Sequence, residues 1–232
     1  TKNDLNECFY RRIDKNPKLP ITTFIRALGL STNDDIYEYF GHDERIEQTI
    51  AKESALTKDG VKNSDDACIE VFKKLRPGEP PTVETARSYI EDMFFDPRKY
   101  DISRVGRHKY NQKLCLGYRL VGHRITKPIV NLFTGEIVAD AGEIINKAKA
   151  EIINNCGAST AFLILENDKE VKVISNGMVD AGEYLDFDVK AECGIDEKVC
   201  AVVLKDILDT CETDDDIKAA IVERKNELIP KH

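Results

Sequence analysis

The sequence predicts an α+β protein: a mainly helical part with short strands, followed by a small β-rich module. In residues 1–127, apolar positions recur at helical spacing between capping residues and prolines, which is typical of short amphipathic helices. After residue 127, short apolar runs such as "KPIVN", "EIVADAGEII", "AFLIL" and "VKVIS" alternate with turn sequences, which is typical of β-strands. A chain of 232 residues is long enough to bury a hydrophobic core.

The first expected elements are a strand and a short helix. The stretch "CFYRRID" predicts a short strand that enters a turn at "KNPKLP", where Pro17 and Pro20 exclude a helix. A short helix follows over residues 22–29, because Gly29 is a favourable C-terminal cap.

A second helix is expected to begin after Thr32. Asp35 stands three residues later, so the two side chains are placed to form a capping box. Residues 42–63 are polar and carry no clear periodicity. We expect a helix tail and an irregular loop there.

Residues 75–101 read "LRPGEPPTVETARSYIEDMFFDPRKYD". Ser64 is expected to cap the helix before this stretch, and Thr82 the helix within it. The prolines and glycine between them predict a stiff turn, so the two helices should form a hairpin. We expect the Phe94–Phe95 pair to pack into the core and Arg76 to bond the last carbonyls of the first helix.

The remaining elements alternate between strand and helix patterns. The segment "NKAKAEIINNCG" predicts a helix between the second and third expected strands. From Val199 onward, "VCAVVLKDILDTC" and "DDDIKAAIVERKNELI" predict two further helices. The acidic run "TDDD" is expected to start the last helix, because carboxylates are favourable near a helix N-terminus.

Several classes of protein are excluded by what the sequence lacks. The longest apolar runs fall far short of the roughly 20 residues of a membrane-spanning helix. The first residues are polar, so we expect no signal peptide. Seven scattered cysteines without a C-x-x-C pair predict reduced thiols, and hence a cytoplasmic protein. No P-loop, G-x-S-x-G, G-x-G-x-x-G or H-E-x-x-H motif is present. We therefore expect no catalytic centre and no metal site, and the missing initial Met predicts an excised fragment.

The clearest functional signal is the charge distribution. Residues 98–127, here called the basic strip, hold nine Lys and Arg but one acidic residue, whereas the whole chain has a net charge of −8. Tyr100, His108 and Tyr110 lie between these cations. Such a strip suits DNA phosphates, which need flexible donors without base-specific geometry. The alternative is a solvated cationic face that pairs with the acidic remainder of the chain.

The order of these motifs resembles that of the beta subunit of bacterial DNA-directed RNA polymerase. The resemblance rests on "RRIDKNPKLPITTFIRALGL" and on "LRPGEPPTVETARSYIEDMFFDPRKYDISRVGRHKYNQKL", and it covers residues 9–120 densely. It implies that the chain is the lobe of that subunit, one of two jaws over the DNA cleft.

The resemblance also implies a function and partners. The lobe would help to hold DNA during transcription as a non-catalytic part of a nucleotidyltransferase. The magnesium ion would be held by another large subunit, so this fragment would carry no cofactor. DNA, the beta prime, alpha and omega subunits and a sigma factor would be its partners, with no membrane contact. The alternative is a docking module for sigma or regulatory factors that does not contact DNA.

The resemblance assigns DNA-phosphate contacts to seven cations that match the basic segments of the family. These residues are Arg11, Arg12, Lys15, Lys18, Arg104, Arg107 and Lys109.

The segment after residue 127 departs from the expected family pattern. Its "TGEIVADAGEII" resembles the barrel-sandwich hybrid insertions that some bacterial lineages place in this subunit. The chain is thus expected to comprise a lobe core over residues 1–127, a β-rich insertion over residues 128–190 and a helical return segment over residues 191–232. Because the insertion is acidic, we expect it to face away from DNA and to dock protein.

Overall fold

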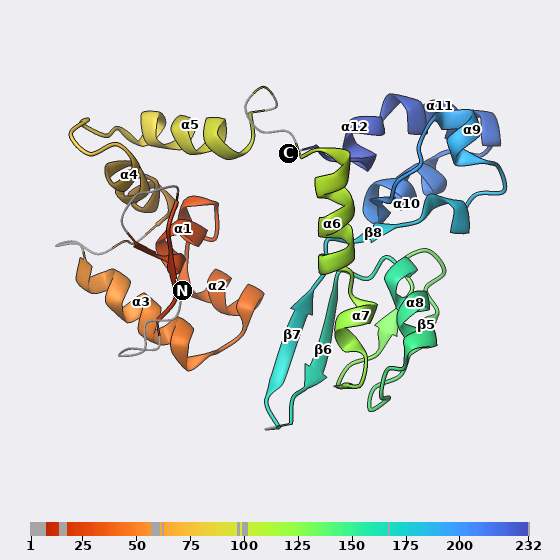
Figure 1. The fold of residues 1–232 in the computed structure, drawn as a ribbon, viewed down its shortest axis with the longest axis horizontal. Coiled ribbons are helices and arrows are strands. Elements are labelled where there is room, and N and C mark those ends of the chain that lie inside the picture. Colours follow the sequence, from red (N-terminus) through yellow and green to blue (C-terminus); the bar gives the residue numbers. More distant parts are fainter. Residues whose placement is uncertain are drawn as a thin grey trace. The chain divides into compact units, whose positions relative to one another are not determined.

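The computed structural model describes residues 8–13, 18–56, 61, 63–96, 98, 102–166 and 168–231. The chain divides into two compact units, Thr1–Tyr100 with His232 and Asp101–Lys231. Both are drawn in Figure 1. We call them the first and the second unit.

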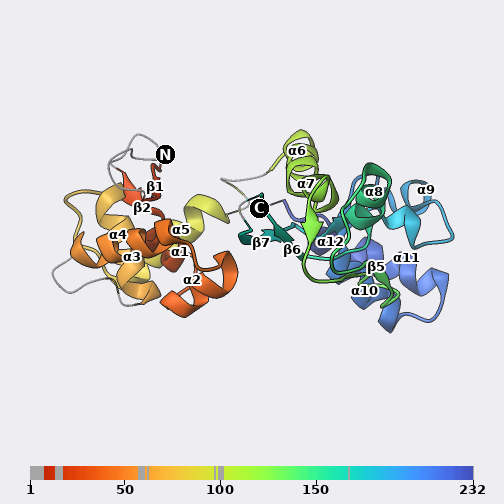
Figure 2. The same ribbon diagram turned by 90° about the horizontal axis from the view of Figure 1, so that it is seen from below.

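The first unit is a group of helices with one short strand pair (Figure 2). Strands β1 and β2 are antiparallel, with Tyr10 opposite Pro20 and Arg11 opposite Leu19. The core is built from Leu19 and from inward residues of α4 and α5, among them Phe72 and Ile90. The elements are β1 (Tyr10–Arg11), β2 (Leu19–Pro20), α1 (Ile21–Ala27), α2 (Asn33–Phe40), α3 (Glu44–Leu56), α4 (Ser64–Leu75) and α5 (Val83–Phe94).

The predicted helix caps are largely confirmed. The Thr32 hydroxyl accepts from the Asp35 amide at 3.1 Å and the Asp35 carboxylate accepts from the Thr32 amide at 2.8 Å, which completes the capping box. Thr82 caps α5 as expected, accepting from the Thr85 amide. The cap of α4 is Asn63 rather than Ser64, because Asn63 has the extended backbone of a cap residue and its side chain accepts from the third amide of the helix.

Helices α4 and α5 form the expected hairpin, and Arg76 contacts both of them. The Arg76 guanidinium lies over the Tyr89 ring at 5.2 Å and pairs with Glu79 at 3.5 Å. The guanidinium therefore contacts the second helix, while the backbone amide of Arg76 donates to the Phe72 carbonyl at the end of the first helix at 2.7 Å, as expected. Phe94 packs edge-on against Phe24 with ring centroids 5.6 Å apart, whereas Phe95 is 50% exposed. The expectation of a buried Phe pair is right for Phe94 alone.

Helix α3 is the element that the sequence pattern concealed. Its inner face holds Thr49 and Glu53, both fully buried, beside Ile50. Polar residues at core positions break the apolar stripe by which a helix is recognised. We expected a helix tail and an irregular loop over residues 42–63, whereas Glu44–Leu56 form a separate helix.

The second unit combines small sheets with short helices. Strands β3, β6 and β7 form an antiparallel sheet, and β4–β5 and β8–β9 are separate pairs. The elements are α6 (Arg104–Leu114), α7 (Gly117–Leu120), β3 (Arg124–Ile125), β4 (Ile129–Val130), β5 (Ile137–Ala139), α8 (Lys147–Asn155), β6 (Thr160–Ile164), β7 (Glu170–Ile174), β8 (Met178–Val179), the 3-10 turn η1 (Ala181–Glu183), α9 (Val189–Cys193), β9 (Val199–Cys200), α10 (Ala201–Thr210), α11 (Asp214–Glu223) and α12 (Lys225–Leu228).

These elements confirm the α+β class. The four predicted strands appear as β4, β5, β6 and β7, and the helix expected between the second and third is α8. Thr213 caps α11, with three acidic residues in its first turn. The barrel-sandwich form of residues 128–190 stays a prediction.

Two cores hold the second unit together. One joins Leu116, Leu120 and Ile125 to residues of β4–β6 and α8. The other joins Val179 to residues of α9–α12, with Leu132 and Phe133 packed against it. Both cores combine residues from both sides of an expected segment boundary, at 127 or at 190. The division of the chain into three segments stays a prediction about its organisation.

None of the helices in the described part of the chain has the length and apolar character needed to cross a bilayer.

Candidate nucleic-acid interface

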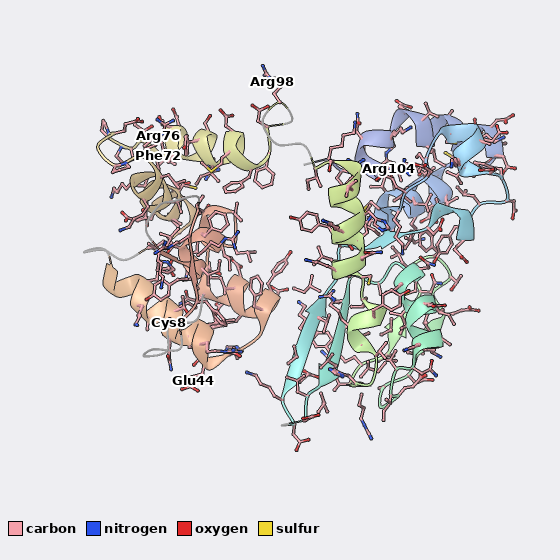
Figure 3. All side chains as sticks on the ribbon, viewed as in Figure 1. Cys8, Glu44, Phe72, Arg76, Arg98 and Arg104 are labelled. Atoms are coloured by element: carbon pink, nitrogen blue, oxygen red, sulfur yellow. The ribbon has the colours of Figure 1, made fainter. Side chains whose placement is uncertain are left out.

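Helix α6 carries the centre of the basic strip. Ser103 caps it by accepting from the Gly106 amide at 3.3 Å, and none of its eleven residues is buried. Figure 3 marks Arg104 at the start of this helix. Because the segment has no apolar stripe, its helical form could be expected only from Ser103 as a possible cap.

Arg107 is an anchor of the helix. Its Nε and Nη2 donate to the two oxygens of Glu197 at 2.8 and 2.9 Å, and Nη1 donates to the Ile102 carbonyl at 2.5 Å. The side chain is 13% exposed. All three guanidinium nitrogens are therefore used inside the second unit.

Arg104 is paired but remains accessible. Its Nη2 donates to Asp196 at 2.7 Å, and the side chain is 62% exposed. One carboxylate leaves most of a guanidinium's five N–H donors available. A phosphate could thus bind Arg104 beside Asp196.

Lys109 lies on the opposite side of α6 from the anchor. Successive residues of an α-helix are 100° apart, so Arg107 and Asn111 share the inner side, where Asn111 accepts from Asn176 at 2.8 Å. Lys109 and Lys113, one turn apart, share the outer side, and both are exposed. They form a short row of cations directed to solvent.

The other cations of the strip have distinct structural roles. Arg119 donates to the carbonyls of Leu114, Cys115 and Ile174 and so ties the end of α6 to β7. The Lys127 amine lies 3.8 Å from the centre of the Phe162 ring. Composition alone does not separate such residues from solvent-facing ones, so the strip is less uniform than its sequence indicates.

The N-terminal cations belong to the first unit. Arg11 ends β1 opposite Leu19, and Arg11, Arg12 and Lys18 are all exposed. Lys15 lies outside the described residues. The contact with DNA predicted for the seven cations stays a prediction. Among them, Arg107 already donates to Glu197 and to the Ile102 carbonyl.

The second unit also holds a cleft of about 1130 Å³ that the sequence did not reveal. Its walls are α6, α8 and the segment from Asp180 to Lys198. Lys198 is half-buried, and its amine donates to the Asn155 carboxamide oxygen at 3.2 Å. Burial lowers the pKa of Lys198, opposed by the nearby Cys115 and Asp180. No pattern in the sequence distinguishes this lysine from its neighbours.

The described residues do not form a metal site. No set of three or more His, Cys, Asp or Glu residues among them is placed to hold a metal ion. All seven cysteines are free thiols, and five of them are buried.

Comparison with known proteins places the chain in a family. Residues 1–128 match the family model described as RNA polymerase Rpb2, domain 2. This match covers more than half of the chain, and the chain therefore belongs to that family.

Three relatives indicate which polymerase subunit the chain is similar to. The chain is 42% identical to the DNA-directed RNA polymerase subunit beta of Clostridioides difficile (strain 630), 44% to that of Clostridium novyi (strain NT) and 45% to that of Clostridium botulinum (strain Loch Maree / Type A3). Each match runs over 231 residues, which is 100% of this chain and 18% of the relative. The family resemblance inferred from the motifs is confirmed, and the clostridial subunits share the segment after residue 127.

Proposed function

We propose that this chain is the lobe of the beta subunit of a bacterial DNA-directed RNA polymerase and helps to hold DNA during transcription. The observation that carries the proposal is the match to clostridial beta subunits over the whole chain. In the complete cytoplasmic enzyme, nucleotide addition and its magnesium ion would belong to another subunit. The beta prime, alpha and omega subunits and a sigma factor would be the protein partners.

The solvent-facing cations support a contact with DNA. Lys109 and Lys113 present two charges on the outer side of α6, and Arg104 keeps most of its side chain exposed. Such residues neutralise phosphates without reading bases. Arg107 would act indirectly, by holding α6 in place through Glu197. The proposed contact residues are Arg11, Arg12, Lys15, Lys18, Arg104, Lys109 and Lys113.

A salt titration of binding to a short fluorescent duplex tests this proposal. Each neutralised phosphate adds about −0.9 to the slope of log K against log salt concentration. We expect roughly −2 to −4 for the chain, which corresponds to about two to four of these cations contacting phosphates at the same time. The double variant Lys109→Gln/Lys113→Gln should bind more weakly, with a slope smaller in magnitude by about 1.8. Glutamine is used because it removes each charge while keeping a polar helix former.

The matched control is Lys147→Gln/Lys190→Gln, which removes two exposed lysines outside the strip. Its slope should equal that of the unmodified chain. Equal slopes in both double variants, or no binding to the duplex at low salt, would overturn the contact through α6. The family assignment would then stand with the docking function below.

A protein-docking role is the second candidate. Two observations favour it: Asp196 and Glu197 offset part of the strip's charge, and the apolar side chains of Val105, Tyr110 and Leu114 are exposed on α6. Exposed apolar groups within a polar surface are typical of protein contacts. In this case the lobe would receive sigma or a regulatory factor, and binding to the duplex would not depend on Lys109.

A further inference from the structure

The cleft of the second unit is partly open to solvent and is lined by both polar and apolar side chains. Its walls carry the side chains of His108, Asn111, Gln112, Asn154 and Asn155, and its volume is about 1130 Å³. Lys198 lies among them, directly before β9. The cleft thus brings a primary amine together with carboxamide groups. Charged residues also line it: Arg104, Glu151, Asp180, Asp188, Lys190, Asp196 and Glu197.

Lys198 differs in its partner from Lys205 and Lys218, two other partly buried lysines of this unit. Lys205 pairs with Asp209 at 2.7 Å, and Lys218 pairs with Glu192 at 3.4 Å. Lys198 instead donates to the neutral carboxamide oxygen of Asn155. Among the described residues, no carboxylate forms an ion pair with it.

This environment favours the neutral amine. A half-buried ammonium loses hydration, and a carboxamide oxygen offsets that loss less than a carboxylate does. Burial accordingly lowers the pKa of Lys198, against the weaker attractions of Cys115 and Asp180. The unprotonated amine is the nucleophilic form, so a larger fraction of Lys198 is reactive near neutral pH than of a solvated lysine.

We propose that Lys198 is a site of lysine acylation, reacting faster with small acyl phosphates than the ion-paired lysines of the same unit. The amine nitrogen would attack the acyl carbon, forming a C–N bond as the C–O bond to phosphate breaks. Phosphate leaves with the electron pair, and the amine proton passes to solvent. The product is a neutral amide, which removes one positive charge from the cleft.

Acetyl phosphate and peptide mapping by mass spectrometry test the proposal on the full chain. The acetylation rate of each lysine is measured in the folded chain and divided by its rate in denaturant, which removes the effect of local sequence. We expect this ratio to be at least about threefold higher for Lys198 than for Lys205, because the neutral fraction rises as the pKa falls. The rate of Lys198 should also rise at lower pH than that of Lys205. A ratio equal to or below that of Lys205 would overturn the proposal.

Asn155→Asp is the matched variant. It places a carboxylate of nearly the same shape 3.2 Å from the Lys198 amine, which holds the amine charged. The Lys198 ratio should fall to that of Lys205, while the Lys205 ratio stays constant and reports that the unit remains folded. An unchanged Lys198 ratio in this variant would show that reactivity does not arise from the missing ion pair and would equally overturn the proposal.

Discussion

Glu53→Ala is expected to lower the free energy of unfolding of the first unit by about 3–5 kcal/mol. Glu53 and Arg26 form an ion pair at 3.1 Å with side chains 2% and 3% exposed. Removing the carboxylate leaves the guanidinium buried without a counter-charge, which is the costly way to break a buried pair. Urea titration followed by circular dichroism measures the loss, and hydrogen exchange locates it in α1 and α3.

The double variant Arg26→Met/Glu53→Leu separates the cost of an unpaired charge from the value of the pair. Apolar replacement of both partners is often close to neutral, and Glu53 Oε1 has no hydrogen-bond partner among the residues that the structure describes. Arg26 also donates to the Ser31 carbonyl and to Asn33, so some loss should remain. We expect the double variant to be more stable than Glu53→Ala alone.

The control for this prediction is an exposed pair of the same type. Arg76 and Glu79 lie 3.5 Å apart with about half of each side chain exposed, so Glu79→Ala should cost less than about 1 kcal/mol. If Glu53→Ala costs as little, water reaches the guanidinium in the folded state, and the pair is not the buried contact described here.

Gly117→Ala is expected to destabilise the second unit by about 3 kcal/mol or more, the upper range for overpacking a close contact. A Cβ at this position would lie 2.0 Å from the backbone oxygen of Ala150. The amide of Gly117 also donates to Asn154 at 2.7 Å, so α7 cannot move away from α8 without losing that bond. Urea titration measures the loss, and hydrogen exchange should show it in both helices.

Gly182→Ala is the control for the same change elsewhere in the unit. Its Cβ would meet the Asp180 carboxylate at 3.4 Å, an ordinary contact. We expect a change within about 0.5 kcal/mol. A similarly small effect of Gly117→Ala would mean that α7 and α8 separate readily and that their contact does not stabilise the unit.

The sequence by itself determined the features that depend on neighbours along the chain. The capping box of Thr32 and Asp35, the cap at Thr82 and the stiff turn of the α4–α5 hairpin follow from local backbone chemistry. The strands of the β-rich segment and the start of α11 follow in the same way. The motif order within residues 9–120 was long enough to identify the family. All of these signals lie within a few residues of what they predict, or within one continuous stretch.

Only the tertiary structure decided which polar residues are buried and which cations face solvent. Glu53 is buried because Arg26, 27 residues away, supplies its counter-charge. Arg107 holds α6 in place because it donates two hydrogen bonds to Glu197, 90 residues away. Lys109, two positions later, faces solvent. The requirement for glycine at 117 and the environment of Lys198 likewise come from α8, which no local pattern connects to either residue. Such roles depend on contacts between distant segments, and those contacts exist only once the chain has folded.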